Sequence, residues 1–385
     1  MKFRLIVLSA LFFSMGFQQC KPKEEKKADT EAVAEAGRDI WTKEQANDWY
    51  AKQGWLVGCD FVPSTAINQL EMWQAATFDT ATINRELGWA ASLGMNTVRV
   101  YLHDLLYQQD AEGFLQRMDA FLQIASRHHI KPLFVLFDSV WDPFPKLGTQ
   151  REPKPGVHNS GWVQNPGKEA LLDSTQYPRL ETYVKAVVRK FASDDRVLGW
   201  DVWNEPENMN NEYYRKMEPL NKADIVLVLL KEAFRWARSV NPRQPLTAGL
   251  WSGDWSAPEK LKPIETLMVE ESDVISFHNY DNAASFEKNI VELQRYGRPI
   301  LCTEYMARGN NSTFEGSLPV AKKYNVAAYN WGLVDGKSQT IYPWDSWKQA
   351  YKGEPEVWFH DIFRKDGTPY KKAETDLIKK LTGKL

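Results

Sequence analysis

The chain has 385 residues, of which 43% are hydrophobic, and its formal net charge at pH 7 is −2. This length suits one large domain with insertions, and a balanced charge without a basic stripe or an acidic tail argues against nucleic-acid binding. Aromatic residues are abundant, with 16 Trp, 15 Tyr and 18 Phe. Because Trp packs well on flat partners, sugar rings among them, this composition favours carbohydrate as one class of partner.

A short apolar segment opens the chain. Lys2 and Arg4 form a basic start, and residues 5–17 are apolar but too few to cross a membrane as a helix. This pattern is typical of a secretory signal peptide, which we place at residues 1–19. The chain is therefore predicted to be exported.

Cys20 follows the apolar segment directly, and a run rich in Lys, Glu and Ala comes after it. This order resembles the signal of bacterial lipoproteins, in which the cysteine is acylated. We therefore predict that Cys20 is a lipid attachment site, that residues 20–40 are a solvated tether, and that the protein is membrane-anchored in the periplasm or at the cell surface. The alternative is an ordinary signal peptide with an incidental cysteine, and hence a secreted protein.

Short apolar strands alternate with amphipathic helices along residues 41–385. We expect strands at residues 56–61, 97–102, 132–137, 197–203, 246–250, 274–277, 299–303 and 326–331. We expect helices at residues 80–93, 113–128, 177–192, 223–240, 257–269, 284–295, 318–324 and 355–363. Such alternation indicates a parallel sheet, and eight units of this kind suit a closed (β/α)8 TIM barrel. An open doubly wound sheet is disfavoured, because no GxGxxG follows the first strand. Residues 41–385 are therefore predicted to form one α/β catalytic domain.

Two cysteines lie within the predicted barrel. Cys59 and Cys302 both fall inside expected strands, and we predict that they are buried free thiols. Neither has a histidine at the spacing of a zinc site, so no metal is predicted. The sequence implies no organic cofactor either.

Two carboxylates stand at the ends of expected strands. The fourth strand ends in Trp203-Asn204-Glu205-Pro206, where Pro206 stops strand pairing, and the seventh ends at Glu304. In a barrel, the carboxyl ends of strands four and seven face each other across the mouth, where active sites lie. Two carboxylates in this arrangement are what glycoside hydrolysis requires, one as an acid and one as a nucleophile.

These motifs resemble the large clan of retaining (β/α)8 glycoside hydrolases, and most closely glycoside hydrolase family 5. The resemblance implies a double displacement with Glu205 as acid/base and Glu304 as nucleophile. The position of Asn204 suits a contact with the sugar 2-hydroxyl. The resemblance also implies four further residues of the substrate site. Arg99 on strand two and Tyr280 at strand six contact the nucleophile. His278 lines the cleft, and Trp331 forms a platform beneath the sugar.

The chain departs from the family at the end of its third strand. A histidine is usual there, but this chain has Phe137-Asp138-Ser139. Either His103, just past strand two, fills that space, or Asp138 binds a sugar hydroxyl instead. The departure leaves the subfamily and the substrate open, but it does not affect the two glutamates.

The predicted function is hydrolysis of β-linked poly- or oligosaccharides such as glucan, mannan or xylan. A transglycosylase would use the same residues with another acceptor. A non-catalytic sugar-binding surface lipoprotein is a second alternative, although binding alone would not require both glutamates. The predicted partners are a carbohydrate and, through the lipid, a membrane. The sugar, endo or exo action and the oligomeric state stay open.

Overall fold

A computed structural model describes Met1 and residues 37–385, so Cys20, the predicted signal peptide and most of the predicted tether lie outside the described residues. Eight parallel strands form one sheet in the order β5-β4-β3-β2-β1-β8-β7-β6. Apart from β5 and β6, each strand pairs with its neighbours in chain order, and β1 pairs with β8. The strands are β1 Val57–Asp60, β2 Thr97–Tyr101, β3 Lys131–Asp138, β4 Gly199–Asn204, β5 Leu246–Thr247, β6 Ile275–Asn279, β7 Ile300–Tyr305 and β8 Ala327–Trp331.

The remaining gap between β5 and β6 is bridged just beyond the end of β5. Leu250 forms a parallel bridge with Phe277 of β6. The Leu250 N–H donates to the Ser276 carbonyl at 3.0 Å, and the His278 N–H donates to the Leu250 carbonyl at 2.8 Å. The strands therefore form the predicted (β/α)8 barrel.

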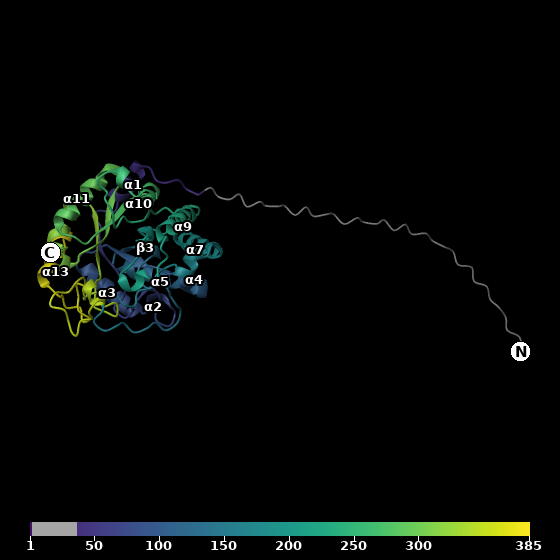
Figure 1. Cartoon of the computed structure of the whole chain (residues 1–385), viewed down its shortest axis with the longest axis horizontal. Helices are drawn as coiled ribbons and strands as arrows, with labels where there is room; N and C mark the ends of the chain where they lie inside the picture. Colours follow the sequence, from purple (N-terminus) through teal and green to yellow (C-terminus); the bar gives the residue numbers. More distant parts are fainter. Residues whose placement is uncertain (2–36) are drawn as a thin grey trace. The chain divides into compact units, whose positions relative to one another are not determined.

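Helices surround the strands (Figure 1). Each buries one face against the barrel, as α7 does with Leu180, Val184, Val187 and Phe191. The eight helices that follow the strands are α3 Thr80–Ser92, α5 Ala111–Arg127, α7 Tyr177–Phe191, α9 Lys222–Arg238, α10 Pro263–Glu271, α11 Ala283–Leu293, α12 Phe314–Lys323 and α13 Lys372–Thr382. Shorter or additional helices are α1 Lys43–Ala51, α2 Gln69–Trp73, α4 Asp104–Gln109, α6 Lys168–Leu172 and α8 Glu212–Arg215. Among residues 37–385, no helix has both the length and the apolarity that a membrane span needs.

The predicted helix at residues 355–363 is wrong. That segment is irregular, and the eighth helix of the barrel is α13 instead. All six residues from 358 to 363 are buried, whereas a helix that packs on one side of a barrel buries only one face. In its place α13 packs beside α12, and the Thr382 hydroxyl donates to the Leu93 carbonyl just after α3 at 2.7 Å.

The N-terminal end of the barrel is closed by α1. Ala46 and Tyr50 of this helix form a buried cluster with Leu133, Leu198 and Leu301, which lie in or next to β3, β4 and β7. Before α1, the guanidinium of Arg38 pairs with the carboxylate of Asp273. The barrel domain therefore begins a few residues before residue 41, where it was predicted to begin. Because this end is filled, a substrate can reach the barrel only from the opposite end.

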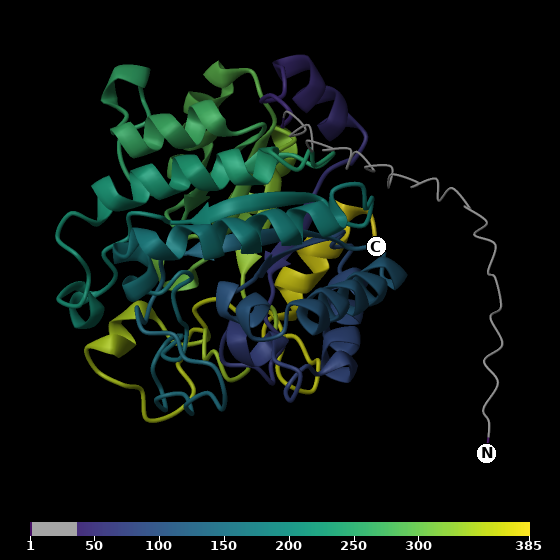
Figure 2. The same ribbon diagram turned by 90° about the vertical axis from the view of Figure 1, so that its right-hand side faces the viewer.

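Two long insertions cover part of that opposite end. We call residues 139–167, between β3 and α6, the β3 loop, and residues 332–371, between β8 and α13, the β8 segment. Figure 2 shows the β8 segment, in yellow-green to yellow, beside the blue-teal β3 loop at the lower edge. The Asn159 N–H donates to the Ser338 carbonyl at 2.8 Å, and the Tyr351 N–H donates to the Gly156 carbonyl at 3.0 Å. The two insertions therefore hold each other in place.

Both barrel cysteines are buried. Cys59 lies in β1 and Cys302 in β7, and each is a free thiol, as predicted.

Candidate active site

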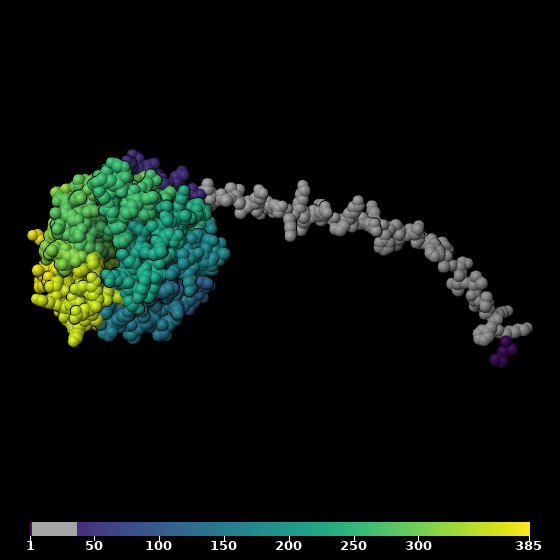
Figure 3. All heavy atoms as spheres, viewed as in Figure 1, coloured from purple at the N-terminus to yellow at the C-terminus, as the bar shows by residue number. Residues whose placement is uncertain are grey.

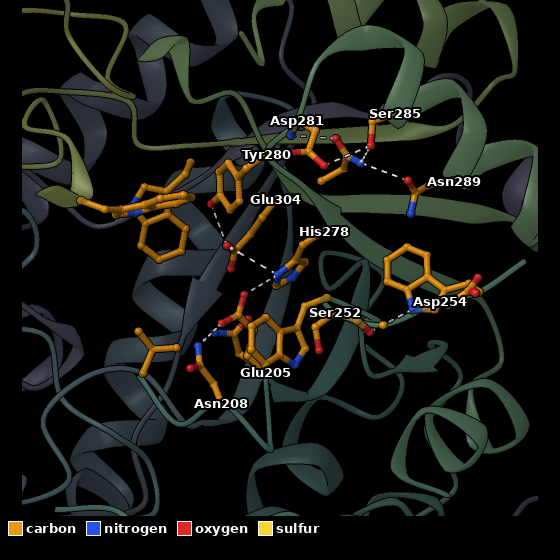
Figure 4. A pocket seen from close by; sticks show the side chains of 18 of the residues that line it. Glu205, Asn208, Ser252, Asp254, His278, Tyr280, Asp281, Ser285, Asn289 and Glu304 are labelled. Atoms are coloured by element: carbon orange, nitrogen blue, oxygen red, sulfur yellow. Dashed lines mark hydrogen bonds and ion pairs between the residues drawn. The ribbon is translucent and has the colours of Figure 1, made fainter. Parts of the chain in front are cut away.

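Glu205 and Glu304 meet at the C-terminal end of the barrel. Glu205 comes directly after β4, and Glu304 is the penultimate residue of β7. One oxygen of each carboxylate and a ring nitrogen of His278 lie within 4.8 Å of one another (Figure 4). Carboxyl groups are about 5–5.5 Å apart in retaining glycosidases and about 6.5–9.5 Å apart in inverting ones. The observed separation therefore fits a retaining enzyme.

The backbone of Glu205 leaves β4 in an unusual conformation. Its φ angle is 44°, in the left-handed region that residues other than glycine rarely adopt. Such strain is often found at functional sites, where the surrounding structure maintains it. Two side chains hold the carboxylate: the His278 Nδ1 lies 2.8 Å from Oε1, and the Asn208 amide donates to Oε2 at 2.5 Å. The sharp turn and these two contacts fix where the carboxylate stands.

Glu304 receives three hydrogen bonds, two from β2 across the barrel and one from the residue that follows β6. Arg99 and the Tyr101 hydroxyl donate to Oε1 at 2.8 and 2.9 Å, and the Tyr280 hydroxyl donates to Oε2 at 2.7 Å. Burial acts to raise the pKa of Glu304, but the nearby His278 and Arg99, with the hydrogen bonds from Tyr280 and Arg99, outweigh it and lower that pKa. Glu304 is therefore ionised at neutral pH.

Arg99 lies at the centre of a buried charge cluster. Its guanidinium also contacts Asp60 at 2.9 Å and Asp201 at 2.8 Å, and its side chain is fully buried. Burial raises the pKa of Asp60 well above its usual range, although Arg99 opposes this effect, and burial also raises the pKa of Asp201. Of the three carboxylates around Arg99, only that of Glu304 has a lowered pKa, so the cluster favours a charged Glu304.

Asn204 is oriented from both sides. Its Oδ1 accepts a hydrogen bond from Arg99 at 2.8 Å, and its amide donates to the Asp138 carboxylate at 2.9 Å. The other oxygen of Asp138 accepts from the Trp162 indole at 2.6 Å. Because these bonds fix which end of the amide is the donor, the chain presents Asn204 to the cavity in one orientation.

The structure does not support the predicted sugar contacts of Asp138 and His103. Asp138 is buried beneath Asn204 with both oxygens bonded to protein donors, so it positions Asn204 and does not line the cavity. His103 is also buried and away from the cavity. Its ring accepts from the Leu105 N–H at the start of α4 and lies 3.0 Å from the Gln164 carbonyl. Neither residue lines the cavity.

A cavity of about 840 Å³ surrounds the two glutamates. Figure 3 shows the surface hollowed where green, yellow and teal atoms meet. Trp331, at the end of β8, lines this cavity as predicted for a platform, and its ring packs edge-on against Tyr101 and Trp162 at centroid distances of 5.7 and 5.8 Å. The other predicted residues that line it are Asn204, Glu205, His278, Tyr280 and Glu304.

Other cavity residues were not predicted from the sequence. The β3 loop contributes His158 and Asn159, and the β8 segment contributes Trp344 and His360. Trp251 and Trp255, which follow β5, line the opposite side together with polar residues of the same loop. The tryptophan content of the chain pointed to such positions. No pattern in the sequence marks the two histidines.

The residues Glu205, His278 and Glu304 resemble a metal site in composition, since each offers a ligand atom. Protein groups also contact both carboxylates. Both oxygens of Glu304 accept protein hydrogen bonds, and both oxygens of Glu205 have protein partners as well. These hydrogen bonds hold the two carboxylates in fixed positions beside each other.

Comparison with known sequences agrees with this geometry. The family model for cellulase, glycosyl hydrolase family 5, matches residues 64–349. A mannan endo-1,4-beta-mannosidase A of Emericella nidulans is 29% identical over 92 residues, which are 24% of this chain and 22% of the relative. The mannan endo-1,4-beta-mannosidase A of Hypocrea jecorina is 21% identical over 262 residues, covering 62% of this chain and 55% of the relative. The chain thus spans about a fifth of the length of the first relative and just over half of the length of the second.

Solved structures show the same fold. The endo-beta-1,4-mannanase from Thermotoga petrophila matches with a TM-score of 0.55 at 13% identity, covering 87% of this chain and 77% of that one. This likeness confirms the predicted barrel. Since the family model matches well over half of the chain, as the motifs on strands four and seven predicted, the chain belongs to the cellulase family, glycosyl hydrolase family 5.

Proposed function

We propose that this protein is a retaining glycoside hydrolase in which Glu304 is the nucleophile and Glu205 the acid/base. The observation that carries the proposal is the close pair of carboxylates with different surroundings. Glu304 has a lowered pKa and three donors, which suits an ionised nucleophile. Glu205 stands beside it with its carboxylate in the cavity, where a leaving oxygen can reach it.

The reaction proceeds in two steps on these residues. Glu304 attacks the anomeric carbon while Glu205 transfers its proton to the departing oxygen, which leaves a glycosyl ester on Glu304. Glu205 then takes a proton from water, the hydroxide attacks the same carbon, and the carboxylate of Glu304 is released. Asn204 is positioned for the 2-hydroxyl, a contact that strengthens in the transition state, and Trp331 supports the ring.

For the substrate, we propose β-1,4-linked mannose chains. The support is that the relatives compared above are mannan endo-1,4-beta-mannosidases by name, at identities of 29% and 21%. Glucan and xylan are the comparison substrates. The hydrogen bonding of both glutamates supports catalysis over a role in sugar binding alone, because binding requires no nucleophile held ionised by three donors.

The stereochemistry of the first product tests this proposal. We expect proton NMR, recorded before mutarotation, to show the β-anomer as the first sugar released from an aryl β-mannoside or a mannan oligosaccharide, because two inversions give retention. The Glu304→Gln variant serves as the blank. An α-anomer would contradict the mechanism. Failure to hydrolyse any aryl β-glycoside or β-linked mannan, glucan or xylan oligosaccharide would contradict the function itself.

We also propose that the enzyme is exported and held at a membrane through Cys20, in the periplasm or at the cell surface. The support is the sequence alone: a basic start, a short apolar run and a cysteine before a charged stretch.

The Cys20→Ser variant is expected to move from the membrane fraction to the soluble fraction, because a hydroxyl replaces the thiol that would carry the lipid. Membrane fractionation with immunodetection measures this shift. The matched control is Gln19→Ser, which changes the neighbouring residue and keeps the thiol. If the Cys20→Ser variant and the unchanged protein partitioned equally, Cys20 would not be a lipid anchor, and the protein would be an ordinary secreted protein.

A further inference from the structure

The cavity around the two glutamates is closed on one side. We infer that the enzyme acts on the non-reducing end of its substrate and removes one sugar residue at a time. This inference rests on the proposed function, because the roles of Glu205 and Glu304 decide which side of the cavity receives which part of the substrate.

The two roles divide the cavity into two sides. The sugar that is transferred must lie over the nucleophile Glu304, and the departing part of the chain must extend beyond the acid Glu205. Next to Glu205, the cavity continues along Ser252 and Asp254, which follow β5, and Ser285 of α11 lies across the cavity from them on the side of Tyr280 (Figure 4). Polar residues that follow β5 line most of the part next to Glu205, which accommodates the departing chain.

The opposite side ends at a wall. Four cavity residues from the β3 loop and the β8 segment form what we call the end wall, namely His158, Asn159, Trp344 and His360. The His158 N–H donates to the Ser346 hydroxyl at 2.9 Å, its ring Nδ1 lies 2.8 Å from the Tyr342 carbonyl, and the Asn159 N–H bonds the Ser338 carbonyl. Because each of these bonds involves a backbone group, the fold itself holds His158 and Asn159 in the end wall.

The end wall stands one side chain away from the nucleophile. Tyr280, which donates to Glu304, has its ring 5.2 Å from that of Trp344 and 5.6 Å from that of His360. On the other flank, Tyr101 also donates to Glu304, and its ring is 5.0 Å from that of Trp162. This space accommodates the sugar over the nucleophile and leaves no second sugar site behind it.

The barrel mouth over β1 and β2 is covered as well. The Asn68 amide donates to the Gly161 carbonyl at 2.8 Å, and the Gln69 amide donates to the Val163 carbonyl at 2.7 Å, which joins the β3 loop to the loop after β1. Within residues 37–385, no residue that lines the cavity around the glutamates comes from the loops that follow β1 or β2. Phe61 and Val62, after β1, line a separate cavity of only about 10 Å³, which is too small for a sugar. A chain that passed through the site would have to continue over these covered loops.

The end wall is also uncharged at neutral pH. Burial lowers the pKa of His158 to about 4 and that of His360 well below its usual value, so both imidazoles are neutral. A neutral imidazole and an amide such as that of Asn159 suit the hydroxyl groups of a neutral terminal sugar. They offer no fixed positive charge to pair with a sugar carboxylate.

The pattern of products tests the inference. We expect mannohexaose labelled at its reducing end to give labelled mannopentaose first and then shorter products in order, with free mannose as the unlabelled product. Cello- and xylo-oligosaccharides labelled in the same way serve as comparison substrates. Short labelled products that form first would show internal cleavage and overturn the inference, while the proposed hydrolase would stand. Absence of hydrolysis, with aryl β-glycosides included, would overturn both.

A variant that opens the end wall tests its role directly. Trp344 is 37% exposed, so Trp344→Ala removes part of the wall with little effect on the core. We expect labelled products shortened by two or more residues to rise several-fold relative to the unchanged enzyme. Tyr213→Ala is the matched control, because Tyr213 is an exposed aromatic residue that does not line the cavity. If the Trp344→Ala variant still removed only terminal sugars, the end wall would not be what restricts the enzyme to terminal cleavage.

Discussion

Replacing Glu304 with Gln is expected to lower kcat/KM by roughly 10⁴-fold or more, as the loss of a catalytic nucleophile does in other enzymes. An amide cannot form the glycosyl ester, so the first step has no nucleophile. The fold should survive. The amide oxygen of Gln can take the place of Oε1 and accept from Arg99 and Tyr101, while the amide nitrogen can donate to the Tyr280 hydroxyl. Arg99 also keeps its contacts with Asp60 and Asp201. Initial rates on an aryl β-mannoside and thermal unfolding of both proteins measure the two parts of this prediction.

The matched control is Glu315→Gln, the same change at an exposed position of α12. It should keep both the activity and the melting temperature of the unchanged enzyme. Substantial turnover by a well-folded Glu304→Gln enzyme would remove Glu304 from the role of nucleophile. A large loss of melting temperature would show instead that the carboxylate is needed for folding of the charged cluster around Arg99.

Replacing Glu205 with Ala is expected to stop the reaction after its first step. An aryl β-glycoside with a good leaving group needs no protonation, so Glu304 still forms the glycosyl ester. Water then attacks slowly, because no general base is present. Azide is a small anion that needs no such base, and it should enter the space left by the carboxylate and restore turnover. The product should be a β-glycosyl azide, which NMR identifies.

The control for this rescue is Glu212→Ala, at an exposed position of α8, on which azide should have no effect. An α-glycosyl azide from the Glu205→Ala enzyme would mean direct displacement and would contradict the retaining mechanism. Rescue of Glu304→Ala in place of Glu205→Ala, with an inverted product, would mean that the two roles are exchanged.

The barrel itself could be predicted from the sequence, because its strands are buried on both faces and therefore read as continuous apolar runs. β2, for example, was expected at residues 97–102 and spans Thr97–Tyr101. The prediction at residues 355–363 was wrong because the same apolar signal also marks a buried irregular segment. Residues 358–363 belong to the β8 segment and bond to its earlier residues, as the Ile362 N–H does to the Leu333 carbonyl at 3.1 Å, and only the tertiary structure shows this.

The candidate site was predictable where residues stand at strand ends. Glu205, Glu304 and Trp331 follow directly from the order of the strands, since the barrel brings those ends together. Asp138 also stands at a strand end, but its side chain lies beneath Asn204, and local sequence does not reveal the depth of a side chain. His158 and His360 were missed because their positions depend on hydrogen bonds between distant segments. His158 bonds the Tyr342 carbonyl, 184 residues away in sequence, and His360 bonds the Met306 carbonyl, 54 residues away.

The dependence of the β3 loop on the β8 segment constrains how such an enzyme can diverge. Each insertion satisfies backbone donors and acceptors of the other, as between Asn159 and Ser338 or between Tyr351 and Gly156. A descendant that lost one insertion would leave these groups unpaired beside the active site, which is costly for buried backbone. The two insertions must therefore be shortened or lengthened together during evolution. A single substitution can breach the end wall, but a lasting open groove requires a paired change in two distant parts of the gene.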